Sequence, residues 1–184
     1  MLALTVRQPG AACIAHLSKR TDNRSRRLPD RYIGAPLAIH AAAALEPEQV
    51  LYMPPGSGFE TLFASTGEWD AWRWWHLGRK PRDEANWPPK LALAAVVAVA
   101  TPVGCHRWDW ENLCGPQHAD TSPSTPGLCS PWVRIGAPWH WELADVRPLP
   151  QPVACRGWRG LWSLPGDMEK SVRAQLDTAY RCHG

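Results

Sequence analysis

Short runs of alternating hydrophobic and polar residues recur through much of the chain, a pattern typical of β-strands. The first run covers residues 2–7, and an apolar stretch at 9–18 then has the length and composition of a short helix. Pro9 favours a helix start there, because its fixed φ suits a first helical turn. Further strands are predicted at 21–25, 36–42, 90–101, 139–145, 153–156 and 161–164.

These elements predict an α+β fold, a small β-barrel decorated with helices. The length of 184 residues fits a single domain over residues 1–184. A helical and loop insertion is expected at about 46–89, and a long Pro-, Gly-, Ser- and Cys-rich loop insertion at about 102–131. The last predicted element is a helix over about 167–181, with Asp167 as its N-cap.

Charge and cysteine content limit the function classes without choosing one. The net charge of +3 permits a nucleic-acid partner but does not require it. No secretory signal opens the chain and the longest apolar run, 91–100, is too short to cross a bilayer, so we expect a cytoplasmic protein with reduced thiols and no membrane partner. We find no P-loop, Rossmann fingerprint, nucleophile elbow or zinc-hydrolase motif, and expect no cofactor.

The basic residues gather near the N-terminus, at the ends of predicted elements. Arg7 ends the first strand, Lys19 follows the first helix, and Asp22 and Arg24 lie in the next segment. Carboxylates among cations stay ionised, whereas burial moves a lysine toward its neutral form. These residues predict either a polyanion-binding site or an acid/base site. A solvated loop is the alternative for the neighbouring cations Arg26, Arg27 and Arg31.

Two groups of motifs carry a family resemblance. The N-terminal group is Arg7-Gln8-Pro9, Lys19-x-x-Asp22-Asn23-Arg24 and Gly34-x-Pro36-Leu37-Ala38-Ile39-His40-Ala41. The C-terminal group is Cys129-Ser130-Pro131-Trp132, the segment 139–149, and Arg156-Gly157-x-x-Gly160-Leu161-Trp162. In this order the motifs resemble the ASCH family (activating signal cointegrator homology), in particular its stand-alone bacterial and phage-type members. The resemblance implies a PUA-like barrel with a cleft that receives RNA or a nucleotide.

One branch of that superfamily removes the acetyl group from N4-acetylcytidine with a lysine, a threonine three residues later and a distant glutamate. Lys19 matches the lysine, but Asp22 stands at the threonine position and Thr21 lies one residue earlier. In an extended segment this shift turns the hydroxyl to the opposite face. Asp22 would then act as the general base, with Lys19 or His40 as the acid.

The sequence therefore predicts an RNA- or nucleotide-binding domain with a cationic cleft. The alternatives are a hydrolase of modified nucleosides, a ribonuclease, and a protein-interaction module that uses the Trp-rich insertion. The candidate catalytic residues are Lys19, Asp22 and Thr21, and the candidate ligand-binding residues are Arg7, Gln8, Arg24, His40 and Trp132. Trp132 would stack on a base, whereas Trp139, His140 and Trp141 are expected in the barrel core.

Metal-ligating residue types occur around the second insertion, at Cys105, His106, Cys114, His118 and Cys129. Their spacing lacks the close C-x₂₋₄-C pairs of zinc ribbons and fingers. The sequence alone therefore favours loop thiols over a metal site, and we predict none from it.

Overall fold

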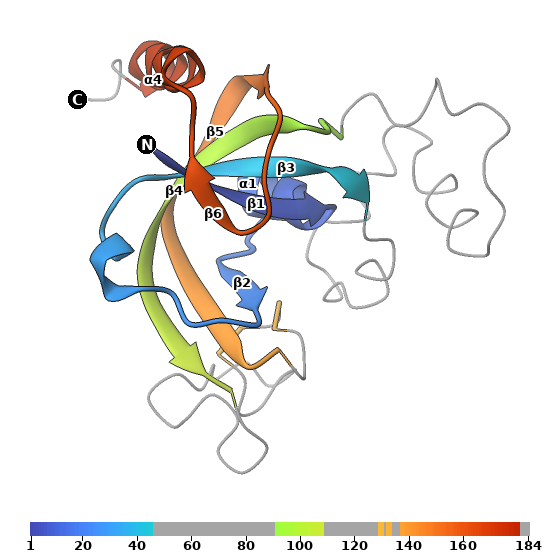
Figure 1. The fold of residues 1–184 in the computed structure, drawn as a ribbon, viewed down its shortest axis with the longest axis vertical. Coiled ribbons are helices and arrows are strands. Elements are labelled where there is room, and N and C mark those ends of the chain that lie inside the picture. The colour runs from blue at the N-terminus through green and yellow to red at the C-terminus, as the bar shows by residue number, and fades with distance from the viewer. Residues whose placement is uncertain (46–90, 109–128, 131, 134–136, 181–184) are drawn as a thin grey trace, which may run out of the picture.

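The computed structural model describes residues 1–45, 91–108, 129–130, 132–133 and 137–180. Within these residues six strands form one mixed sheet, and two α-helices pack against it, which confirms the predicted α+β class (Figure 1). In chain order the elements are β1 (Leu2–Gln8), α1 (Gly10–His16), β2 (Thr21–Arg24), a 3-10 turn (Asp30–Tyr32), β3 (Leu37–Leu45), β4 (Ala95–Arg107), β5 (Trp139–Ala154), β6 (Leu161–Ser163) and α4 (Gly166–Tyr180).

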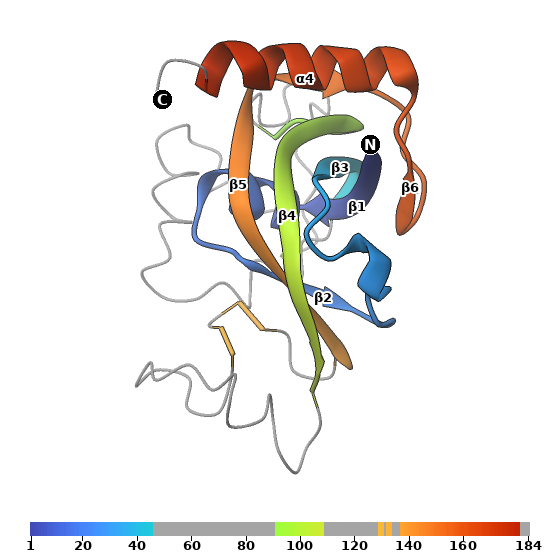
Figure 2. The ribbon, with the colours of Figure 1, turned by 90° about the vertical axis from the view of Figure 1, so that its left-hand side faces the viewer.

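The strand order in the sheet is β2-β5-β4-β3-β1-β6. Of the described strands, only β1 and β3 pair in parallel, and the other neighbours are antiparallel. The long strands β4 and β5 run side by side from the α4 end of the molecule to the opposite end (Figure 2). Among the described strands, β2 and β6 are the two edges of this order, so the sheet is not closed into the barrel that we predicted.

Hydrophobic side chains on the two sides of the sheet form two cores. Leu4 and Val6 of β1 belong to the first core, together with Ile14 of α1. Ala3 of β1 faces the opposite way and belongs to the second core, together with Val172 of α4. The alternation along β1 thus places α1 and α4 on opposite faces of the sheet.

The predicted strand at 90–101 is confirmed in part, but it begins at Ala95 and continues to Arg107. Residues 102–107 were assigned to the loop insertion because of Pro102 and Gly104, and that assignment is wrong. The β3–β4 pairing ends at Ala100, and the β4–β5 register shifts between Pro102 and Gly104. Beyond Ala100, β4 therefore pairs with β5 but no longer with β3, and its register is irregular. A strand tolerates proline or glycine at such a position.

β5 replaces the two separate strands that we predicted at 139–145 and 153–156. Its register with β4 shifts around Asp145, whose positive φ of 48° marks a bulge within the strand. Pro148, Pro150 and Pro152 follow in β5, beyond the residues that pair with β2. Because β2 does not pair with β5 at these positions, the missing N–H groups of the prolines remove few hydrogen bonds between strands. A chain that looks interrupted by turn residues is therefore one bent strand.

The remaining predicted elements agree with the structure: the strands at 2–7, 21–25, 36–42 and 161–164, and the helices at 9–18 and 167–181. Asp167 is not the N-cap of α4, because the helix already begins at Gly166. No helix in the described ranges combines the length and apolar character needed to span a membrane. The predicted helical pieces of 46–89 and the remainder of the second insertion, from 109 to 128, lie outside the described residues.

Candidate functional site

Lys19 follows α1 directly and is buried, with 6% of its surface exposed. Its Nζ donates a hydrogen bond to the Thr21 carbonyl and lies 5.9 Å from the centroid of the Trp132 ring. Burial removes water from the ammonium and lowers the pKa of Lys19, an effect that the nearby Asp22 carboxylate opposes. The structure thus holds a lysine whose proton is easier to remove than that of a surface lysine.

Asp22 and Arg24 lie two residues apart on β2, so their side chains share one face of the strand. The Arg24 Nε donates to the Asp22 Oδ2 over 2.5 Å, and its Nη2 donates to the Thr5 carbonyl over 2.8 Å. The guanidinium also lies 5.5 Å from the centroid of the Trp141 ring, within range of a cation–π contact. Arg24 is therefore fixed on three sides. We call Lys19, Asp22, Arg24 and Trp132 the Lys19 cluster.

Thr21 belongs to the other face of β2. It precedes Asp22 by one position and pairs with Glu142 of β5, whereas Asp22 pairs with Trp141. Successive side chains of a strand point to opposite sides, so the Thr21 hydroxyl does not share the face of Asp22 and Arg24. Only the Thr21 carbonyl takes part in the Lys19 cluster, as the acceptor of the Lys19 hydrogen bond.

Two side chains at the end of β1 have different environments. Arg7 is exposed at the surface. Gln8 is 1% exposed, and its amide oxygen accepts a hydrogen bond from the Ala12 N–H over 3.0 Å. Its Nε2 donates to the Ala92 carbonyl over 2.9 Å. Both ends of the Gln8 amide thus bind the protein itself, which favours a structural role in fixing the start of α1.

His40 lies on the opposite side of the sheet from the Lys19 cluster. Its neighbour Ile39 belongs to the first core, whereas His40 itself makes an edge contact with Trp162 of the second core at 5.4 Å. The ring is 1% exposed and bonds through Nδ1 to the Thr5 hydroxyl at 3.3 Å and through Nε2 to the Cys155 carbonyl at 3.1 Å. Burial lowers the pKa of His40. The predicted pairing of His40 with Lys19 as an acid is therefore not formed in this structure.

Trp132 covers Lys19 and is itself buried. Its Nε1 donates to the Ser18 hydroxyl over 3.2 Å, and its carbonyl accepts a hydrogen bond from the Asn23 amide over 3.1 Å. The ring in this arrangement packs on the protein, so it offers little open face to a base.

Trp158 is the most exposed of the described tryptophans, at 53%, and the sequence analysis did not single it out. It stands between the exposed residues Arg156 and Arg159 and contacts Trp162 with ring centroids 5.1 Å apart. An aromatic face flanked by cations suits an unpaired base. The sequence signal that could have pointed to Trp158 was the pair of arginines around it, Arg156 and Arg159.

Cys13 of α1 is a second buried titratable group near Lys19. Burial raises the pKa of the Cys13 thiol to about 12, and the Lys19 ammonium opposes this shift. The thiol is therefore neutral at physiological pH and is a poor nucleophile.

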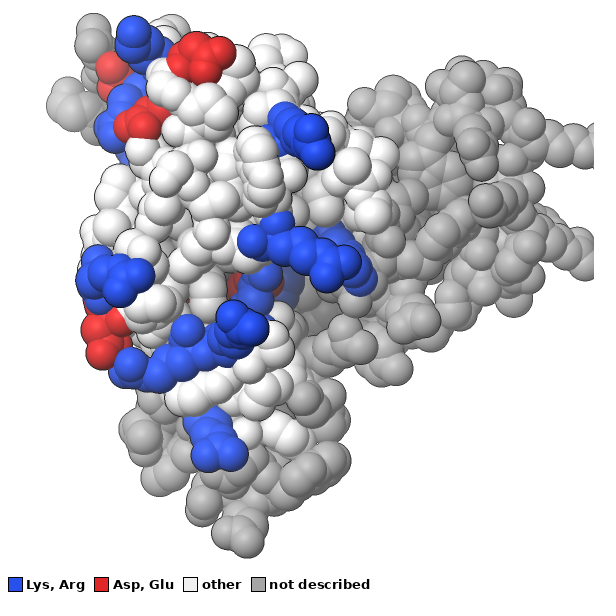
Figure 3. All heavy atoms as spheres, in the orientation of Figure 1, with Lys and Arg blue, Asp and Glu red and all other residues white. Residues whose placement is uncertain are grey.

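Positive side chains gather on one face of the molecule. Figure 3 shows several Lys and Arg side chains around the middle of this face, with one partly covered acidic side chain among them. This face provides cations for an anionic ligand.

Some metal-type residues also come together, on β4, β5 and the segment just before Trp132. His106 and Cys129 lie with His140, which the sequence analysis had placed in the barrel core. Cys105 instead accepts a hydrogen bond from the Leu28 N–H. The described cysteines, Cys13, Cys105, Cys129 and Cys155, form no disulfide with one another, and the predicted candidates Cys114 and His118 lie outside the described residues.

The structure thus joins Lys19, Asp22, Arg24 and Trp132, and it separates them from His40 and from the Gln8 amide. No protein-family model matches this chain, and a search of curated proteins finds no match either. Function therefore has to be inferred from the side chains and their contacts.

Proposed function

We propose that this chain binds RNA or a nucleotide through the Lys19 cluster and the cations around it. The observation that carries the proposal is the buried lysine beside the Asp22–Arg24 ion pair. Burying an ammonium costs free energy unless charged or polar partners compensate for the lost water, so a buried lysine with a lowered pKa beside an ion pair is a candidate for a binding site.

In this proposal each side chain has a distinct task. Lys19 and Arg24 contact phosphate or polar base edges, and Asp22 accepts a hydrogen bond from an exocyclic amine. The exposed Arg7 extends the cationic surface toward the ligand backbone.

The resemblance to the ASCH family supports the same proposal. Three residues of the N-terminal motif, Lys19, Asp22 and Arg24, lie together in one cluster. Gln8 of the same motif binds the start of α1, the helix that precedes Lys19. We propose that the sheet is an open variant of the PUA-like fold and that its ligand surface lies at the junction of α1 and β2.

Fluorescence anisotropy with a labelled single-stranded RNA, measured over a series of salt concentrations, tests this function. Arg7→Gln should reduce the slope of log affinity against log salt by about 0.7, the value for one phosphate contact on a single strand. Lys19→Met should weaken binding at least about tenfold, as expected for a lost charged hydrogen bond. Arg173→Gln on α4 is the matched control, since Arg173 pairs with Glu169 on the opposite side of the sheet. Equal affinities for all three variants would refute the proposal.

A second candidate is a hydrolase of modified nucleosides, and the lowered pKa of Lys19 is the observation in its favour. A neutral Lys19 amine can take a proton from water as the water attacks an acyl carbonyl, and can return it to the leaving amine. Incubation with N4-acetylcytidine and related nucleosides, with product detection by mass, should then show acetate release that Lys19→Met abolishes. The absence of turnover would leave binding alone.

A further inference from the structure

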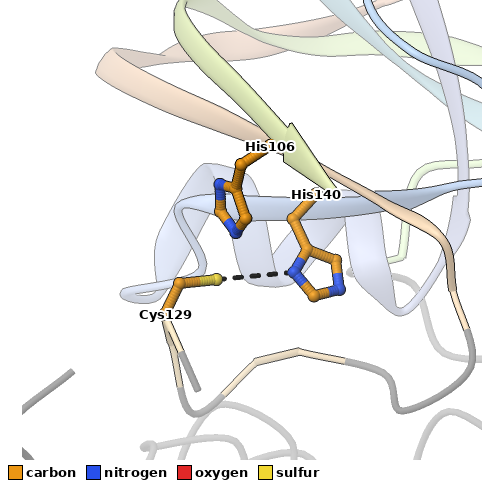
Figure 4. Close-up of side chains that lie close together, drawn as sticks. All are labelled: His106, Cys129 and His140. Atoms are coloured by element: carbon orange, nitrogen blue, oxygen red, sulfur yellow. Dashed lines mark hydrogen bonds between the residues drawn. The ribbon is translucent and has the colours of Figure 1, made fainter. Parts of the chain in front are cut away.

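A pair of histidines and a cysteine meet where β4 and β5 run side by side. His106 and His140 are direct partners in the β4–β5 register, and their rings stand edge to face with centroids 5.2 Å apart. The Cys129 Sγ lies 3.5 Å from the His140 Nδ1, and the three ligand atoms all lie within 4.8 Å of one another (Figure 4). We propose that His106, Cys129 and His140 bind a zinc ion.

The spacing of the ligand atoms fits such an ion. Zinc binds cysteine sulfur at about 2.3 Å and histidine nitrogen at about 2.0 Å, and a tetrahedral angle between two such bonds places sulfur and nitrogen about 3.5 Å apart. The Cys129 Sγ and the His140 Nδ1 already have this separation. In Figure 4 a ring nitrogen of His106 faces the same two atoms, so a small movement of that ring completes the set.

Glu142 supports the site from behind. Its Oε1 lies 2.6 Å from the His106 Nδ1, which makes Nε2 the ring nitrogen that faces the metal. A carboxylate on the second nitrogen of a histidine is a recurrent feature of zinc sites, because it fixes the ring and makes it a better ligand. Gly104 provides the room, since a Cβ there would lie 2.7 Å from the Glu142 Oε2.

The ligand types select the metal. Magnesium and calcium prefer oxygen ligands, whereas two imidazoles and one thiolate suit zinc. Both histidines are buried, which excludes water from most of the site. Zinc usually has four ligands, so the three described side chains leave one position for a water molecule or a further residue.

A zinc ion here would fix the segment that carries Trp132. Cys129 lies three residues before Trp132, and the Trp132 ring lies over Lys19. The ion would tie this segment to the β4–β5 ribbon and so hold Trp132 in place. The spacing in the sequence concealed the site, because His140 joins it only through the pairing of two strands.

Metal analysis of the intact chain tests the proposal. After purification without chelators and dialysis, the protein should retain about one zinc per chain, and cobalt in place of zinc should give a thiolate-to-cobalt absorption band. Cys129→Ser should remove that band, and His140→Asn should weaken zinc binding at least about tenfold. Cys155→Ser is the matched control, because Cys155 is a thiol outside the cluster. Background zinc content, or the same affinity in all variants, would overturn the proposal.

Thiol alkylation of the unmodified chain provides a second test that does not depend on how well the variants fold. Added zinc should slow alkylation of Cys129, identified by peptide mass, and leave the rate at Cys155 unchanged. Equal rates at Cys129 with and without zinc would show that the thiol is not a ligand.

Discussion

Gly157 lies against the buried ring of His40, and the substitution Gly157→Ala should destabilise the fold strongly. A Cβ at this position would lie 2.1 Å from the His40 Cε1 and 2.5 Å from its Nδ1. The ring cannot withdraw easily, because it bonds to Thr5 and to the Cys155 carbonyl and packs on Trp162. Overpacking a core costs about 1–3 kcal/mol, and each lost hydrogen bond costs about 1 kcal/mol more. We expect a loss of about 3–5 kcal/mol in the free energy of unfolding.

Urea unfolding measures this loss, and a double-mutant cycle identifies its cause. In the His40→Ala background the ring is gone, so Gly157→Ala should cost less than about 1 kcal/mol there. Gly166→Ala is the control, since no atom lies within 4 Å of its added Cβ. An equal cost of Gly157→Ala with and without the His40 ring would refute the reasoning, because the destabilisation would then arise from the backbone and not from the contact.

Three further predictions concern charge and the proposed metal site. Lys19→Met should raise the free energy of unfolding near pH 7, because burial disfavours the ammonium of the unmodified chain. Below the usual lysine pKa the unfolded chain binds more protons than the folded chain, so the unmodified protein gains stability as pH rises and its stability difference from the variant should shrink. A stability difference that stays constant with pH would contradict this. Burial lowers the pKa of His40, so the unfolded state binds more protons below the usual histidine pKa and stability should fall on acidification through that range; His40→Gln should make urea midpoints less sensitive to pH, and an unchanged profile would exclude His40 as the cause. Gly104→Ala should push Glu142 off His106 and weaken zinc binding about 10- to 100-fold with little loss of stability, as measured by competition with a chelating dye; unchanged affinity would remove Glu142 from the site.

The elements with simple local patterns were predictable from the sequence. β1 and β3 are short runs rich in apolar residues, α1 follows a proline, and α4 has the length of an ordinary helix. Pro102 and the prolines of β5 wrongly indicated loops. A proline costs a strand little stability where one of its neighbouring strands no longer pairs with it, as is the case at these positions. That information is set by the tertiary structure and is not present in any local window.

The candidate site shows the same division. Lys19, Asp22 and Arg24 are close in sequence, so their meeting could be predicted from a single turn and strand. The His40 side chain points to the other side of the sheet from these three residues. The side to which it points depends on how β3 is oriented in the sheet, which the sequence does not show. His140 joins His106 through a strand register that the sequence does not state. Residues that act together across strands are thus the part that local patterns miss.

The position of β1 in the sheet has a consequence for how the chain folds. β1 lies between β3 and β6, and Leu2 pairs with Ser163 near the other end of the described chain. Such distant pairings raise the contact order and slow folding, since long loops must close before the pairs form. During synthesis β1 leaves the ribosome before β3 but cannot gain its β6 partner until residues 161–163 have emerged. Among the described strands, β1 is therefore made early and completed late, and its open edge is a place where a nascent chain would need protection from aggregation.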